Sequence, residues 1–147
     1  MNKLNTKTER RIRRSKITFF VLQIFNGLSA LAGGYGLMND PTGKALQMDR
    51  SMLVSTPFDD FLIPGLVLFI INGIGNATGA VLTMTTFKHA ATVAALFGLI
   101  LMIWIISQVS WIGYQSFLQP LYFTTGLAQF MAAYICIKQQ KKLYATI

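Results

Sequence analysis

Two adjacent carboxylates are the side chains in this sequence best suited to chemistry. Asp59 and Asp60 lie in the stretch STPFDDFLIPGL, at the start of a long apolar run. Such a pair can bind a cation or a protonated ligand. The same residues also fit a capping box, in which Thr56 caps a helix, Pro57 takes its first position and Asp59 complements the helix dipole. Both readings stay open, and on the second one Pro64 falls about two turns into the helix and bends it.

Other residues with reactive side chains are scarce. Cys136 and His89 are each the only residue of their kind in the chain. A single cysteine supports neither Cys-x-x-Cys exchange nor a disulfide framework, and one histidine with one cysteine makes a poor metal or haem site. No serine stands in a triad pattern, and no glycine-rich phosphate loop is present. We therefore expect no catalytic residue, no cofactor and no metal. An enzyme would have to use Asp59 and Asp60, with nearby loop groups, on a lipid headgroup.

Composition places these residues in a membrane. Of the 147 residues 53% are hydrophobic and only 12% are charged, and the mean hydropathy is +0.50. Apolar runs long enough to cross a bilayer, which takes about 20 residues, cover 17–38, 61–84, 90–112 and 118–137. The sequence thus predicts an all-α membrane protein, an antiparallel four-helix transmembrane bundle. Residues 1–16 form a basic arm before it and residues 138–147 a basic tail after it.

The charges predict the orientation of the bundle. Eleven of the 13 basic residues precede the first span, separate the second from the third, or follow the fourth. The loop after the first span has only Lys44 and Arg50, together with four of the five acids. Lys and Arg accumulate in cytoplasmic loops, so we expect both termini of this multi-pass membrane protein to be cytoplasmic. A cleaved leader ending at Ala30-Leu31-Ala32 is a competing reading, but the apolar run continues past it.

The basic arm has two explanations. It orients the chain during insertion, or it also binds anionic lipid headgroups, which attract clustered Lys and Arg beside a membrane. We expect no nucleic-acid partner, because the arm has no interleaved aromatic residue before Phe19 and no recognition fold presents it. The sequence does not predict whether the chain forms a homo- or hetero-oligomer.

Polar side chains within the spans are all amides or hydroxyls. A projection at about 100° per residue places them on inward faces: Gln23 and Asn26 on the first span, Asn72 and Asn76 on the second, Gln108 on the third, Thr125 and Gln129 on the fourth. By depth, Asn26, Asn72 and Gln129 should meet near mid-membrane. They either hold the bundle together by hydrogen bonds or line a neutral pocket for a small or lipid-like molecule. The candidate ligand-binding residues are therefore Asn26, Asn72, Asn76, Gln108, Gln129, Asp59 and Asp60.

A signature around the carboxylates resembles that of a family of small bacterial four-span membrane proteins. Its pattern is SPF-x-DFLIPGL-x-L, matched here by Ser55, Pro57, Phe58, Asp60, Phe61, Leu62, Ile63, Pro64, Gly65, Leu66 and Leu68, with Thr56 inserted after the serine. The segments NDPTGKALQM and LQPLYFTTGLA are similar to the same family's turn before the second span and to the start of its fourth. The resemblance implies a four-helix bundle in a bacterial cell membrane and no particular chemistry.

These features together predict a non-enzymatic membrane protein that binds a small hydrophobic ligand, a lipid or a membrane partner. A small transporter or channel subunit is the alternative. No ionisable group is expected at mid-membrane, which disfavours a proton relay or ion-coupled transport. A continuous hydrated path from Asp59 and Asp60 through the amide cluster would favour transport, whereas a closed interior would favour binding.

Overall fold

The computed structural model describes residues 3–85 and 87–145, with side chains from residue 6 onward, and this part of the chain is helical without a strand. The long helices are α1 (Lys3–Asn39), α4 (Ala90–Ile112) and α5 (Leu118–Tyr144). The second span consists of α2 (Leu62–Val67), the π-helical segment η3 (Leu68–Ile74) and α3 (Gly75–Met84). Two short 3₁₀ turns, η1 (Lys44–Leu46) and η2 (Arg50–Leu53), lie in the loop between α1 and α2.

Four helical stretches are long and apolar enough to cross a membrane: Thr6–Asn39, Leu62–Met84, Ala90–Ile112 and Leu118–Tyr144. The predicted all-α membrane bundle is therefore confirmed. The first and last helices are longer than the predicted spans, because the basic arm and tail continue as helix. Lys, Arg, Glu and Gln are good helix formers, so these polar segments extend α1 and α5 without a break.

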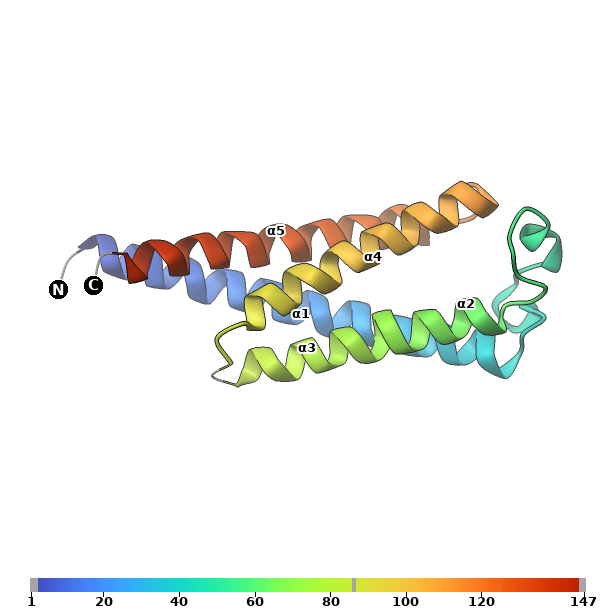
Figure 1. Cartoon of the computed structure of the whole chain (residues 1–147), viewed down its shortest axis with the longest axis horizontal. Coiled ribbons are helices and arrows are strands. Elements are labelled where there is room, and N and C mark those ends of the chain that lie inside the picture. The colour runs from blue at the N-terminus through green and yellow to red at the C-terminus, as the bar shows by residue number, and fades with distance from the viewer. Residues whose placement is uncertain (1–2, 86, 146–147) are drawn as a thin grey trace.

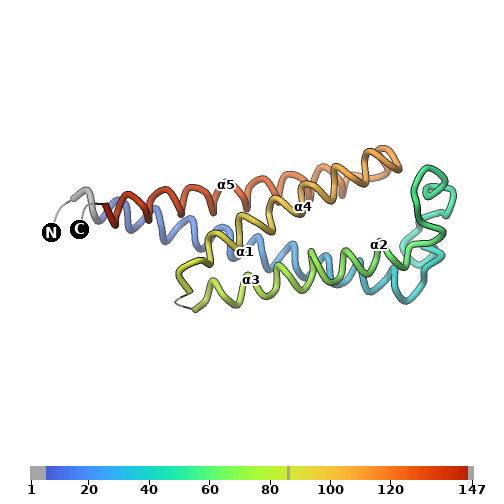
Figure 2. Tube along the Cα trace, viewed as in Figure 1, coloured from blue at the N-terminus to red at the C-terminus, as the bar shows by residue number. Residues whose placement is uncertain are grey.

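The helices run antiparallel, and α1 is the central one. It contacts α5 on one side and α2, η3 and α3 on the other, while α4 packs chiefly on α5. Figures 1 and 2 show α1 beginning and α5 ending at the same end of the molecule, beyond the turn that joins α3 to α4. We call this the terminal end, and the opposite end, which contains residues 40–61 and 113–117, the loop end. From the terminal end to the loop end, α4 diverges from the second span (Figure 1).

Glycines allow the closest helix contacts. A Cβ on Gly98 of α4 would stand 2.8 Å from the backbone oxygen of Gly126 and from the backbone nitrogen of Phe130 in α5. Between α1 and the second span, a Cβ on Gly34 would come within 2.8 Å of the backbone oxygen of Gly65. Backbones that approach this closely gain dispersion contacts. Such contacts drive helix association in a membrane, because lipid tails are as apolar as the side chains and no hydrophobic driving force remains.

The start of the second span differs from the predicted capping box. Helix α2 begins at Leu62, and Thr56 instead accepts a hydrogen bond from the Phe58 N–H at 3.2 Å within the loop. The carboxylate beside the helix start is that of Asp60, whose Oδ1 accepts from the Leu62 N–H at 2.9 Å. The capping prediction for Thr56 and Asp59 is therefore wrong. Pro64 falls in the first turn of α2, where its missing N–H costs no helical bond. The irregularity in this span is the π-helix further on.

The loop between α1 and α2 is held by its own hydrogen bonds. Asp40 accepts from the Thr42 hydroxyl at 2.6 Å and from the Thr42 and Ala45 N–H groups at 3.1 and 2.9 Å. These bonds, with that from the Thr42 hydroxyl strongest, hold the pKa of Asp40 below its ordinary value. The Phe61 N–H donates to the Pro41 carbonyl at 3.0 Å, and the ring of Phe61 is buried with Leu37 and Leu53. The loop is thus anchored on the bundle.

Candidate functional site

An amide network fills the middle of the bundle. The Asn26 Nδ2 donates to Gln129 Oε1 at 2.9 Å, and the Thr125 hydroxyl donates to Asn26 Oδ1 at 2.8 Å. The Gln129 Nε2 donates to Asn76 Oδ1 at 3.0 Å and to the Ala94 carbonyl at 2.9 Å. Asn26, Asn76 and Gln129 are at most 1% exposed. One connected set of hydrogen bonds therefore joins α1, α3, α4 and α5.

A second polar contact lies one to two turns nearer the terminal end. The Thr83 hydroxyl is 3.1 Å from Gln23 Oε1 and 2.8 Å from the Gly79 carbonyl, while the buried Gln23 Nε2 has no partner. A hydroxyl has a single hydrogen to donate. When Thr83 donates this hydrogen to the Gly79 carbonyl, its oxygen can accept from Gln23 Nε2, provided that the Gln23 amide is rotated by about 180°. Amide orientation is assigned from the hydrogen-bond network. Gln23 and Thr83 then connect α1 to α3.

Asn72 differs from the other amides. Its side chain is 1% exposed, yet neither its Nδ2 nor its Oδ1 has a hydrogen-bond partner. Only its main-chain oxygen joins the network, by accepting from Asn76 Nδ2 at 2.9 Å. The prediction that Asn26 and Gln129 meet in the core is thus matched by a direct bond, whereas the Asn72 side chain forms none with either. Asn72 lies within η3, and π-helical turns are often found at functional sites.

The amide groups of the network bond to one another and to the backbone, which limits what the network can do chemically. Each side-chain amide nitrogen and oxygen of Asn26, Asn76 and Gln129 makes at least one of the hydrogen bonds given above. A ligand would have to break bonds between helices to bind these groups. The geometry therefore fits the structural interpretation, in which the amides set the positions of the four spans.

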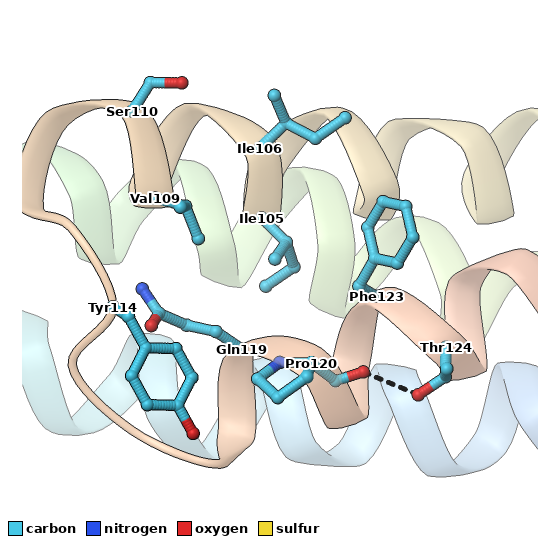
Figure 3. Close-up of a pocket in the computed structure, with 9 residues that line it drawn as sticks. All are labelled: Ile105, Ile106, Val109, Ser110, Tyr114, Gln119, Pro120, Phe123 and Thr124. Atoms are coloured by element: carbon cyan, nitrogen blue, oxygen red, sulfur yellow. Dashed lines mark hydrogen bonds between the residues drawn. The ribbon is translucent and has the colours of Figure 1, made fainter.

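A hollow lies between α4 and α5 at the loop end. It is an open groove of about 420 Å³. Its lining is Ile105, Ile106, Val109, Ser110, Tyr114, Gln119, Pro120, Phe123 and Thr124. Figure 3 shows Ile105 and Val109 on α4 directed toward the α5 side, with Tyr114 below at one end. We call this hollow the α4–α5 groove.

The polar groups in the α4–α5 groove are already engaged. Gln119 is 6% exposed, accepts from the Gln115 N–H at 2.8 Å and donates to the Gly113 carbonyl at 3.1 Å. The Thr124 hydroxyl bonds to the Pro120 carbonyl of its own helix, the bond drawn in Figure 3. What the groove offers is therefore apolar surface. Sequence reasoning missed it, because no pattern in one apolar helix reveals a gap against its neighbour.

A smaller hollow, the loop-end cavity, lies where α4 diverges from α2. It has a volume of about 50 Å³. Its lining comprises Leu37, Met48, Leu53, Thr56, Phe58, Phe61, Pro64, Trp104, Ser107, Gln108, Trp111 and Ile112. Gln108 therefore lies here and apart from the amide network. The rings of Phe58 and Trp111 meet edge to face, with centroids 5.7 Å apart.

Asp59 and Asp60 lie, in sequence, between two residues that line this cavity. Asp59 is exposed and Asp60 half-buried, and they stand between the cavity-lining residues Phe58 and Phe61. Cys136 is buried in α5 and His89 is exposed in the α3–α4 turn, stacked edge-on against Phe87. Within residues 3–85 and 87–145, no three His, Cys, Asp or Glu side chains gather as metal ligands would.

Comparisons with known proteins do not assign this site. No protein-family model matches the chain, and searches of the curated proteins and of the solved structures find no match either.

Proposed function

We propose that this chain is a non-enzymatic membrane protein that binds the apolar chain of a lipid in the α4–α5 groove. The observation that carries the proposal is the groove itself: about 420 Å³ of space lined almost wholly by apolar side chains. A water-sized group needs about 10–15 Å³ of such space, so the groove has room for a chain of a dozen or more methylenes. Each methylene removed from water contributes about 0.8 kcal/mol, although a chain already in a bilayer gains only from better packing.

The surroundings of the groove support a lipid as its occupant. It lies between two membrane-spanning helices, within the last turns of α4 and the first turns of α5. Tyr114, 69% exposed, and Ser110 stand on its lining, and an amphipathic ring at this depth suits the headgroup boundary. The amide network favours binding over transport, since a substrate passing through the bundle would have to break the hydrogen bonds that Asn26, Asn76 and Gln129 make between helices.

The placement in the cell completes the proposal. We infer from the basic residues at the terminal end that both termini lie in the cytoplasm, and from the resemblance of the SPF-x-DFLIPGL-x-L pattern that the membrane is a bacterial cell membrane. The exposed Arg10, Arg11, Arg13 and Arg14 and the nearby Lys138 and Lys141 would then attract anionic lipid headgroups of the inner leaflet. Membership of the four-span family that the SPF-x-DFLIPGL-x-L pattern resembles stays a prediction.

Filling the groove tests the lipid proposal. Ile106 lines it and is 53% exposed, whereas Ile103, on the same helix and 54% exposed, does not line it. The variants Ile106→Trp and Ile103→Trp therefore add the same volume inside and outside the groove. The proteins are placed in nanodiscs with a photoactivatable phospholipid, and the lipid crosslinked to each peptide is measured. Peptides of α4 and α5 should be labelled strongly in the wild type and in Ile103→Trp, and severalfold less in Ile106→Trp. Equal labelling in all three proteins, or labelling spread evenly over the four spans, would overturn the proposal.

A further inference from the structure

The loop-end cavity has an aromatic lining that the proposed lipid-chain site does not use. Phe58 and Phe61 of the loop and Trp104 and Trp111 of α4 surround it, together with Gln108 and smaller groups. The faces of Trp, Tyr and Phe rings attract cations through their quadrupoles, most strongly for Trp and where water is excluded. Both tryptophans of the chain are in this one lining.

Charge at the loop end also favours a cation. The segment 40–61 has four aspartates against Lys44 and Arg50, in a chain whose net charge is +8. Asp40 is engaged by Thr42 and Ala45, and Asp49 Oδ1 accepts from the Ser51 N–H at 2.8 Å. Asp60 uses one oxygen on the Leu62 N–H, and the Asp59 carboxylate accepts no hydrogen bond from any described residue. Negative charge is therefore left over beside Phe58 and Phe61.

We propose that the loop-end cavity binds a small organic cation, a methylated ammonium group such as that of choline. The cavity is small, about 50 Å³, so such a head inserts one or two of its methyl groups between the rings while the rest of the molecule stays at the mouth. The rings face the spread positive charge of these methyls, while Asp59 and Asp60 supply the long-range attraction. A bare metal ion would instead need about six oxygen ligands, whereas the side chains of this lining offer only the oxygens of Thr56, Ser107 and Gln108.

This inference does not depend on the α4–α5 groove. The two hollows share no lining residue, so either can fail while the other holds. A choline-type group has two sources, a free small molecule or the headgroup of a phospholipid. Their shared chemistry is the quaternary ammonium, and the experiment separates them.

Tryptophan fluorescence is the direct assay, because Trp104 and Trp111 report on this cavity alone. The purified protein is placed in phosphatidylglycerol nanodiscs and titrated with choline and, separately, with 3,3-dimethyl-1-butanol, which has the same shape without the charge. Choline should change the emission and bind at least about tenfold more tightly than the neutral alcohol, which equals ~1.4 kcal/mol. Equal binding of choline and the neutral alcohol overturns the proposal. A response to neither compound also overturns it, unless phosphatidylcholine changes the emission in the lipid experiment described next.

In the lipid arm, the emission in phosphatidylcholine nanodiscs is compared with that in phosphatidylethanolamine–phosphatidylglycerol nanodiscs. A shift with phosphatidylcholine alone assigns the site to a lipid headgroup, and a shift with free choline assigns it to a soluble cation. If neither occurs, the proposal is wrong.

Two variants test the residues without removing the reporters. Phe58→Leu removes one ring of the lining, and Phe117→Leu removes a 70% exposed ring at the same end that does not line the cavity. Phe58→Leu should weaken choline binding severalfold, whereas Phe117→Leu should leave it unchanged. The double variant Asp59→Asn with Asp60→Asn should weaken choline binding. Added salt should weaken choline binding to the wild type in the same way, because it screens the attraction of the two carboxylates. Equal effects of both Phe variants would contradict the aromatic assignment.

Discussion

Replacing Gln129 by leucine is the most informative perturbation of the bundle core. Gln129 bonds to Asn26, to Asn76 and to the Ala94 carbonyl. Interhelical hydrogen bonds in membrane proteins contribute about 0.6 kcal/mol each on average. Three such bonds predict that Gln129→Leu lowers the free energy of unfolding by about 2 kcal/mol. The loss should be larger if Asn26 Nδ2 and Asn76 Oδ1, left buried, find no new partners.

A double-mutant cycle with Asn26 isolates the bond between the two amides. Asn26→Leu alone removes the bonds to Gln129 and Thr125, for a cost of about 1 kcal/mol on the same scale. The Asn26–Gln129 bond is lost in both single variants but only once in the double variant. The double variant should therefore cost about 0.6 kcal/mol less than the sum, or more where orphaned partners are relieved.

Asn72→Leu serves as the matched control, because it is the same kind of change at an amide of similar burial. Since neither side-chain polar atom of Asn72 has a partner, this variant should leave the free energy of unfolding unchanged or raise it. The measurement is equilibrium unfolding by detergent titration, followed by circular dichroism, for all four members of the cycle and the control. Additive costs for Asn26 and Gln129, or a destabilisation by Asn72→Leu as large as that by Gln129→Leu, would refute the network as drawn.

Two further predictions concern packing and orientation. Gly98→Ala should destabilise the bundle by on the order of 1–3 kcal/mol, because its Cβ would meet the α5 backbone at 2.8 Å. Gly33→Ala is the control and should be close to neutral, because its nearest contact is the Leu68 side chain at 3.5 Å. Equal losses of thermal stability in detergent for the two variants would contradict this packing. Orientation is tested with single cysteines introduced at Thr42 or at Gln139 in a Cys136→Ser background. An impermeant thiol reagent added outside the cell should react at position 42 only, since basic residues cluster at the terminal end. Labelling at 139 alone would reverse the inferred topology, and equal labelling at both positions would contradict it.

The architecture was accessible from sequence because span length and inward polar faces are local properties. The third span was predicted at residues 90–112, and α4 covers Ala90–Ile112. The inward placement of Asn26 and Gln129 followed from helical periodicity and their depth, and a 2.9 Å bond joins them. Buried amides in lipid must find partners, so the pattern constrained the packing of α1 against α5.

The start of the second span could not be predicted in the same way. Thr56, Pro57 and Asp59 satisfy the capping pattern, but the helix begins at Leu62. Tertiary contacts decide the matter: the Phe61 N–H bonds to Pro41, and the Phe61 ring is buried with Leu37 and Leu53. A local signal that contributes about 1 kcal/mol is overridden when the competing register buries a phenylalanine.

The π-helix explains why Asn72 departs from the predicted cluster. A projection at a constant 100° per residue assumes i→i+4 bonding throughout the span. In η3 the bonding extends to i→i+5, as when the Gly75 N–H donates to the Ile70 carbonyl. This widens the turn and changes the angle at which side chains leave the helix. Nothing in the residues LFIINGI signals such a segment, so the Asn72 side chain was expected to face partners that it does not bond.

The hydrogen bonds of the bundle core support placing the proposed ligands at the loop end. At mid-membrane, Asn26, Asn76 and Gln129 hold one another, and a ligand that displaced them would have to replace bonds that also hold the helices together. At the loop end lie the α4–α5 groove and, where α4 diverges from α2, the loop-end cavity. The bonded polar groups of the groove, Gln119 and Thr124, bond within residues 113–124 and not between spans. Binding there costs the fold little, because no bond between spans is broken. The same amides that close the core to a ligand therefore hold the helices in the arrangement that opens the loop end.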